Sequence, residues 1–265
     1  MIDSVDLKQD LQQQLDLQAR RQQQTTGAGE AMGSNVGFYV GFYGTKQPNT
    51  SKPHQAFANT TKSVLCLCPI LDKDGFEGLR HVCRLIGSTR VQSLESAYQL
   101  CKLTLNPMFV QLVRDVAEVR DTVRTVFFEG SGAVAFWAMS PKAGPMTLNM
   151  NKRNEALHTA MVHFRQWEEA LGLSRGIRWA SWIADTTPGS RLHVMRALVR
   201  LKMTQHKRLA KLLEATGSAR IVERSPNNAF WGDAHGGSPE MGQGENWMGR
   251  ILVEVRDERR RGAAK

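Results

Sequence analysis

Apolar positions recur at helical spacing along most of this 265-residue chain, and two short β-rich runs interrupt them. The pattern predicts helices over 76–86, 93–102, 106–116, 152–173 and 190–217. It predicts strands within 37–44, which carries a doubled Phe-Tyr pair, and within the apolar run 64–71. Ser190 and Gly217 are the expected start and stop signals of the last helical stretch. The expected fold is therefore α+β and predominantly helical.

Departures from this pattern set the expected domain boundaries. Residues 1–35 are rich in glutamine and predict a marginal helix or a tail, whereas 36–258 form one domain. Residues 127–150 carry glycines and prolines and predict a loop-rich stretch, not a helix or strand. The arginine run within 259–265 predicts a solvated basic tail.

Charge changes the picture more than hydrophobicity does. The formal net charge is +10 and the pI is about 9.8, which favours an anionic partner such as a nucleic acid or a nucleotide. A basic bias of the whole proteome is the plainer alternative. The predicted helices over 190–217 carry many basic residues, so their polar faces are either simply solvated or turned to phosphates.

The cysteines and the chain ends bear on the compartment. The four cysteines lack the spacing of a disulfide framework or a zinc site. Cys66 and Cys68 are expected on one face of a strand, as small buried hydrophobes. No secretory leader and no apolar run of membrane-spanning length is present. We therefore expect a protein of a reducing compartment, the cytoplasm or alternatively the nucleus, with no metal, no cofactor and no membrane partner.

The densest chemical signal is the spacing of Glu95, Gln99 and Lys102. Positions i, i+4 and i+7 lie along one face of a helix, so an acid, an amide and an amine are stacked together. A carboxylate and an ammonium that converge on a cleft can transfer protons or hold an anionic sugar phosphate. The plainer alternative is a surface helix with incidental polar spacing.

A second dense segment runs from 221 to 256. It combines glycines with Trp231 and Trp247 and with several asparagines. Glycine lets backbone N–H groups approach a phosphate, and tryptophan offers a face for a purine or a ribose. The alternative is an ordinary surface loop around a buried Trp231.

The order of these motifs resembles one protein family. A helix with E-x-x-x-Q-x-x-K is followed by the 194–217 stretch, then by Val222-Glu223, N-A-F-W-G-D and G-x-N-x-x-G. This order is similar to that of the NADAR/YbiA-like family, named for links to NAD and ADP-ribose. The segments at 42–44 and 56–59 resemble the family's opening F-Y and F-S-N motifs more loosely.

The resemblance implies an α+β, largely helical N-glycosidase. Some members cleave the ribosyl–amine bond of riboflavin-pathway intermediates, and others remove ADP-ribose from guanine bases. Glu95 is implied as the catalytic acid/base and Lys102 as its catalytic partner. The substrate-binding positions implied by the resemblance are Tyr43, Asn59, Gln99, Trp182, Asn228, Trp231, Gly232 and Asn246.

Departures from the family pattern affect the expected activity. Asn228 stands where the family usually has Asp, so a second carboxylate is missing from that position. Ser96 stands where His commonly follows the glutamate, and Trp182 or Trp179 replaces a family tryptophan across a longer loop. Relative to the family, the domain also carries an insertion at about 125–178.

The leading hypothesis is an N-glycosyl hydrolase that removes ADP-ribose from a guanine base in nucleic acid or a nucleotide. In its transition state the anomeric carbon gains positive charge, which a carboxylate stabilises. Lys102 either pairs with a phosphate and with Glu95, or attacks C1 as a neutral amine to form a Schiff base. The alternatives are an N-glycosidase of ribosylamino-pyrimidine phosphates and a non-catalytic ADP-ribose or nucleic-acid binding module.

Overall fold

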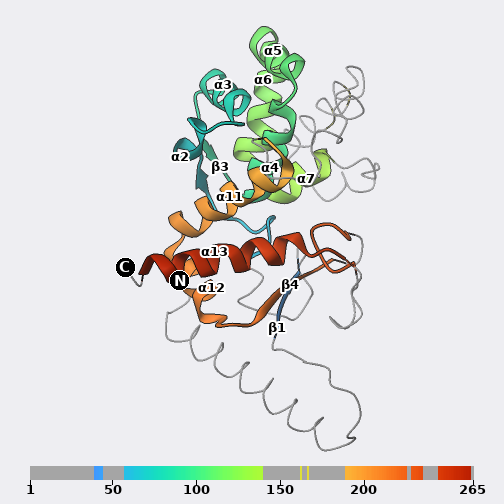
Figure 1. Cartoon of the computed structure of the whole chain (residues 1–265). Helices are drawn as coiled ribbons and strands as arrows, with labels where there is room; N and C mark the ends of the chain where they lie inside the picture. The colour runs from blue at the N-terminus through green and yellow to red at the C-terminus, as the bar shows by residue number, and fades with distance from the viewer. Residues whose placement is uncertain are drawn as a thin grey trace, which may run out of the picture.

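The computed structural model describes residues 39–43, 57–139, 189–225, 228–234 and 244–263, together with the isolated positions 162 and 166. Its described elements are mostly helices, with two small two-stranded sheets, which confirms the α+β, largely helical fold (Figure 1). The tail predicted over 1–35, most of the helix predicted over 152–173, and Trp182 lie outside the described residues.

Helix α4 (Leu94–Thr104) lies at the centre of the first group of helices. Every one of its residues is buried. It packs against α3 (Glu77–Ile86), α5 (Pro107–Asp115), the π-helical segment η2 (Arg124–Glu129) and α7 (Gly132–Ala138). Its N-cap is Ser93, whose Oγ accepts a hydrogen bond from the N–H of Ser96 at 3.1 Å. The cap therefore fixes the helix start two residues before Glu95.

Helix α11 (Arg191–Gln205) joins the two ends of the chain. It contacts α4 and α2 (Cys68–Leu71) on one side and α12 (Lys207–Ala215) and α13 (Trp247–Ala263) on the other, and Figure 1 shows it between these groups. Ser190 caps it as predicted, because its Oγ accepts the N–H of His193 at 3.2 Å. Gly217, with φ of +61°, follows the end of α12 as predicted.

Two remote segments form the parallel sheet that faces α13. Strand β1 (Tyr39–Tyr43) pairs with β4 (Arg220–Arg224) in the register Tyr39 with Arg220 through Tyr43 with Arg224. Strands β2 (Leu65–Cys66) and β3 (Arg90–Val91) form a separate antiparallel pair. Helix α13 packs along β4, so the last helix covers a sheet built from both ends of the described chain (Figure 1).

The run 64–71 is only partly a strand. Strand β2 ends at Cys66, and helix α2 begins at Cys68 because Pro69 fits the first turn of a helix. The predicted arrangement of Cys66 and Cys68 on one strand face is therefore wrong, and Cys68 is exposed. Cys83 and Cys101 are buried.

The prediction of a loop over 127–150 is wrong for its described part. Residues 124–129 are π-helical, and α7 follows at 132–138 and packs on α4. Gly132 permits this, since a Cβ there would lie 2.5 Å from the Ser93 Oγ. Here glycine serves close helix packing instead of a turn.

The basic tail predicted over 259–265 is helical as far as Ala263. Arg259 Nε bonds Glu214 Oε1 at 2.8 Å, and Arg260 Nη2 donates to the Glu214 carbonyl at 2.8 Å. Arg196 and Arg200 pair with Glu254 and Glu258 at 2.7 and 2.5 Å. Part of the positive charge is therefore used to join α11, α12 and α13.

No helix within the described ranges is both long and apolar enough to cross a membrane.

Candidate active site

Glu95 lies inside the protein at the start of α4. It is 6% exposed, its N–H donates to the Asn59 carbonyl at 3.0 Å, and its Oε1 accepts from Gln99 Nε2 at 2.7 Å. The i, i+4 spacing read from the sequence thus gives a direct hydrogen bond. The alternative of a surface helix with incidental polar spacing is wrong, because this face of α4 is buried.

Electrostatics around Glu95 act in two directions. Burial raises the pKa of its carboxyl above the usual value, while the Gln99 hydrogen bond and the Lys102 ammonium lower that pKa. Lys102 is itself 6% exposed. Glu95 and Lys102 are both buried and lie on the same face of α4. A buried acid and a buried amine on one face are typical of a site for proton transfer.

Glu223 is a second acid, partly buried and with one carboxyl oxygen fully enclosed, and the sequence did not single it out as a site residue. Burial, followed by the charges of Glu95 and Asp233, raises the pKa of Glu223 to about 8. The charge of Glu95 acts on the pKa of Glu223, so the fold places this residue of β4 near the carboxyl group on α4. The two residues are 128 positions apart in the sequence. The second carboxylate that Asn228 lacks is therefore present at Glu223.

Buried oxygen acceptors without a donor gather around Glu95. Asn59 Oδ1, Gln99 Oε1 and Glu223 Oε2 are all buried and find no hydrogen-bond partner among the described residues. The Asn59 carbonyl accepts the N–H of Glu95, and Gln99 donates to the Glu95 side chain. The charge of Glu95 raises the pKa of Glu223. Because buried polar atoms are normally paired, this arrangement favours a bound group that supplies hydroxyl or N–H donors.

An aromatic chain leads away from this centre. The ring of Tyr98 on α4 meets Trp231 edge to face, with centroids 5.6 Å apart, and Trp231 meets Phe230 at 4.8 Å. Burial raises the pKa of Tyr98 well above its usual value. The guanidinium of Arg191, at the start of α11, lies 3.2 Å from the Phe230 ring centroid. The tryptophan of the C-terminal segment thus contacts the Glu95 helix.

Arg191 places a positive charge at the outer end of that aromatic chain. Its Nε is buried and has no hydrogen-bond partner among the described residues. Burial lowers the pKa of Arg191, while the charges of Tyr98 and Glu245 raise it. A guanidinium in this state fits an anionic ligand group, since arginine binds phosphate and carboxylate through paired N–H groups.

Asn246 and Asn228 have partners within the protein. Asn246 is 3% exposed; its Nδ2 donates to the Ile221 carbonyl at 2.8 Å and its Oδ1 accepts the Glu223 N–H at 2.9 Å. Asn228 Oδ1 accepts the Trp231 N–H at 3.0 Å and closes the turn. Their predicted contacts with a ligand stay predictions, whereas these hydrogen bonds give both residues a structural role.

The described glycines of this segment bring backbone close to backbone. A Cβ on Gly232 would lie 2.7 Å from the Glu223 carbonyl oxygen, Gly244 is enclosed by main chain, and Gly249 lies against the Ile221 carbonyl and the Asn246 side chain. The N–H groups of Asn246, Trp247 and Met248 donate to the carbonyls of Gly232, Phe230 and Trp231, respectively. These N–H groups are therefore used within the fold and do not form the phosphate cradle suggested by the glycine content.

Of the remaining predicted substrate-binding positions, the structure describes Tyr43 and Gly232. Tyr43 ends β1 opposite Arg224, so its backbone lies one residue beyond the register of Glu223. Gly232 lies in the turn against Glu223, as described above. Trp182 lies outside the described residues. Among the residues that are described, Glu95, Gln99, Lys102, Asn59 and Trp231 lie on or against α4, and their roles in binding stay predictions.

Lys202 was also missed as part of this region. It is 1% exposed, burial lowers its pKa to about 7, and its Nζ donates to the Ala58 carbonyl at 3.1 Å. It thereby holds the segment whose next residue, Asn59, accepts the N–H of Glu95. A sequence signal existed, because a lysine interrupts an otherwise apolar face of the 190–217 stretch.

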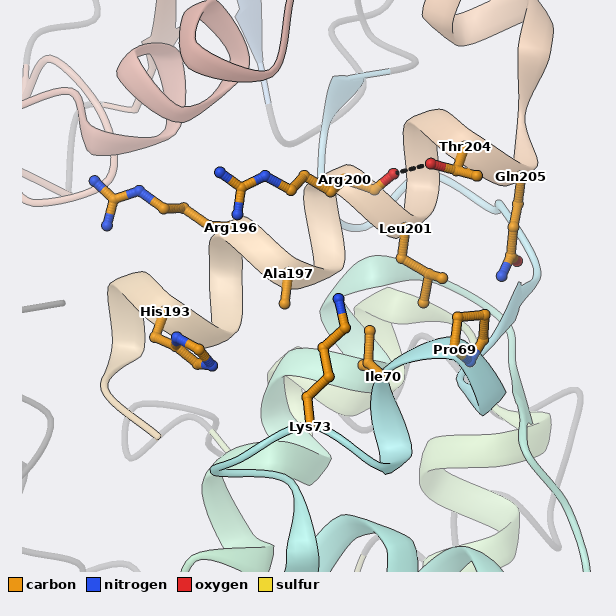
Figure 2. A pocket seen from close by; sticks show the side chains of 10 residues that line it. All are labelled: Pro69, Ile70, Lys73, His193, Arg196, Ala197, Arg200, Leu201, Thr204 and Gln205. Atoms are coloured by element: carbon orange, nitrogen blue, oxygen red, sulfur yellow. Dashed lines mark hydrogen bonds between the residues drawn. The ribbon is translucent and has the colours of Figure 1, made fainter. Parts of the chain in front are cut away.

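A surface pocket of the described residues lies away from Glu95. It measures about 330 Å³ and lies between α2 and α11 (Figure 2). Its Gln205 bonds both the N–H and the carbonyl of Cys66, and its Arg196 and Arg200 are already paired with glutamates. These groups are committed to holding elements together, so the site at Glu95 remains the better candidate. No group of metal-ligating side chains occurs within the described residues.

Part of this chain matches a known protein family. A family model described as the NADAR domain matches residues 137–260, which include Glu223, Trp231 and Asn246 but begin after α4. This match spans just under half of the chain and supports a NADAR/YbiA-like family. In this chain, Glu95 and Lys102 lie on α4, outside the matched region.

Curated relatives match over short stretches. The riboflavin biosynthesis protein VVA0006 of Vibrio vulnificus is 42% identical over 90 residues, which are 34% of this chain and 23% of that protein. The N-glycosidase YbiA of Escherichia coli is 45% identical over 65 residues, 24% of this chain and 38% of YbiA. The matches therefore span well under half the length of either relative.

A solved structure also aligns. The NMR structure of E. coli YbiA superposes with a TM-score of 0.42 at 19% identity, covering 86% of this chain and 88% of that one. A superposition this loose carries no argument about the site.

We expect Asn246→Ala to lower the free energy of unfolding by about 3 kcal/mol, because it removes two buried hydrogen bonds and leaves the Glu223 N–H unpaired. Urea denaturation followed by circular dichroism measures the loss. Asn228→Ala is the matched control, with a loss of about 1 kcal/mol for a half-exposed turn. Equal stability of the Asn246 variant and the wild type would contradict the structural role.

Proposed function

We propose that this protein is an N-glycosidase that hydrolyses the bond between a ribose C1 and an amine nitrogen. The observation that carries this proposal is the set of unpaired buried acceptors on three residues that interact with Glu95, namely Asn59, Gln99 and Glu223. The hydroxyls of a ribose are donors of the kind these oxygens lack. The printed name of YbiA as an N-glycosidase supports the same reaction class.

The chemistry follows from the buried carboxylate. Breaking an N-glycosidic bond builds positive charge on C1, and the ionised Glu95 stabilises that charge in a region largely without water. The same carboxylate accepts a proton from the attacking water. Gln99 donates a 2.7 Å hydrogen bond to Oε1 of Glu95. This bond fixes the orientation of the carboxylate and leaves Oε2 of Glu95 for the reaction.

The finer proposal is that the ribose belongs to ADP-ribose attached to a guanine base. The Tyr98–Trp231–Phe230 chain offers aromatic surface beside the sugar, and Arg191 offers a charge for a phosphate. The net charge of +10 favours a guanine within nucleic acid over a free metabolite.

A second candidate substrate is a ribosylamino-pyrimidine phosphate. The name of the Vibrio relative, a riboflavin biosynthesis protein, favours it. Like ADP-ribosylated guanine, a ribosylamino-pyrimidine phosphate contains a ribose, an amine leaving group and a phosphate. A third candidate, a module that binds ADP-ribose without hydrolysis, differs only in lacking turnover.

The test is to incubate the protein with DNA that carries ADP-ribose on guanine and, separately, with the ribosylamino-pyrimidine phosphate. Mass spectrometry then measures release of free ADP-ribose or of ribose 5-phosphate. We expect release of ADP-ribose. Release from the pyrimidine substrate alone selects the second candidate. With no turnover, ADP-ribose at 100 times its Kd stabilises a binding module by about 2.7 kcal/mol; absence of both effects contradicts all three candidates.

We expect Glu95→Gln to lower kcat by about 10²- to 10⁴-fold, the usual range for an acid–base residue. The amide retains the shape of the side chain but carries no charge to stabilise C1. Because burial raises the pKa of Glu95, wild-type activity should fall with acidification at a pH above the usual glutamate range. Glu77→Gln, an exposed glutamate on α3, is the control and should keep full activity.

We expect Lys102→Ala to lower kcat and to move the acid limb of the pH profile to higher pH, because the Lys102 charge lowers the pKa of Glu95. Borohydride distinguishes the two roles of this lysine. If its neutral amine attacks C1 and expels the leaving amine, reduction of the resulting imine fixes the sugar's mass on Lys102. If it acts only as a charge, no adduct forms and Lys102→Arg retains part of the turnover.

A further inference from the structure

Glu223 is held more firmly than a surface acid on a strand end. On one side its N–H donates to Asn246 Oδ1 at 2.9 Å, and its carbonyl accepts the Asp233 N–H at 2.9 Å. The turn at Gly232 presses against the same carbonyl, where no Cβ fits. The backbone that carries Glu223 is therefore fixed between β1, the turn and the start of α13.

The side chain of Glu223 lies on the inner face of β4. Residues two apart on a strand face the same way, and Ile221 is 1% exposed within the hydrophobic core. One carboxyl oxygen of Glu223 is buried and unpaired, as described above. No hydrogen bond in the described part of the chain uses that oxygen, so it remains available to a bound molecule.

The two acids of the site have different surroundings. Glu95 receives a hydrogen bond from Gln99 and faces the Lys102 ammonium, both of which favour its ionised form. The charged groups that act on Glu223 are Glu95 of α4 and Asp233 of the turn, and both are acidic. Burial raises the pKa of both acids, but a hydrogen bond and an ammonium oppose that rise at Glu95, whereas the two acids that act on Glu223 add to it. Glu95 is therefore the better base and Glu223 the better proton donor.

We propose that Glu223 is the general acid of the reaction and donates its proton to the leaving nitrogen while Glu95 serves as the base. This inference rests on the proposed N-glycosidase function. It also accounts for Asn228, because the second carboxyl comes from β4 and not from the turn.

Atoms and charges balance in this scheme. The C1–N bond breaks with its electron pair on nitrogen, which takes the proton of Glu223 and leaves as a neutral amine. Water adds to C1 and gives its proton to Glu95. The products are the free sugar and the amine, and one proton passes from Glu95 back to Glu223 through solvent. An exocyclic amine is a poor leaving group as an anion, so the proton donor is required.

The decisive variant is Glu223→Gln, which has the shape and the neutral charge of the protonated acid but no proton to give. We expect kcat to fall by about 10²-fold or more with little change in KM. Wild-type kcat should fall as the pH rises through about 8, where Glu223 ionises, and the variant should lose this alkaline limb. Glu77→Gln is again the control and should keep the wild-type profile.

Stability gives a readout that does not require turnover. Because the pKa of Glu223 is raised on folding, the folded protein binds more protons than the unfolded chain from the usual glutamate pKa up to about pH 8. Wild-type stability should therefore decline over this range as pH rises, and Glu223→Gln should decline less.

Each outcome has one meaning. Full activity and a persistent alkaline limb in Glu223→Gln, with Glu95→Gln inactive, overturn the role of Glu223 and leave the glycosidase standing. A wild-type rate that stays flat to pH 9.5 overturns it as well, even if the variant does not fold. If the wild type hydrolyses neither substrate, the proposed function fails and the general acid with it.

Discussion

The burial of α4 is the constraint on which the rest of the structure depends. A helix with every residue enclosed must place its polar side chains inside the protein, where each carboxyl or amide without a partner costs free energy. The hydrogen bond between Gln99 and Glu95 meets part of that requirement. The remaining oxygens stay unpaired, and a fold keeps such groups where a ligand or a reaction uses them.

Helix α11 makes this burial possible. It covers α4 on one face and carries α12 and α13 on the other, so both halves of the chain meet across it. Its buried Lys202 holds the Ala58 carbonyl, and Asn59 then accepts the N–H of Glu95. The position of the acid therefore depends on a residue more than one hundred positions away.

The described residues of the C-terminal segment, 228–234 and 244–249, form hydrogen bonds with β4 and with one another. Its asparagines and glycines seal the outer edge of β4 and dock the first turn of α13 on the turn that bears Trp231. An open strand edge is a liability in any sheet, and here side-chain amides close it. The result is a rigid frame that holds Glu223 and Trp231 against the α4 helix.

Local rules were enough to predict the helices at 76–86, 93–102 and 106–116 and the shared face of Glu95, Gln99 and Lys102, because i, i+4 spacing is a property of the backbone alone. The same rules failed at 127–138, where glycines permit close packing of a helix that a local pattern interprets as a loop. They also failed at 259–263, whose arginines find Glu214 only after α12 and α13 are packed together. The proximity of Glu223 to Glu95 was decided by tertiary structure, since an acid on a strand and an acid on a helix act on each other, and have raised pKa values, only when packing brings them together and removes water.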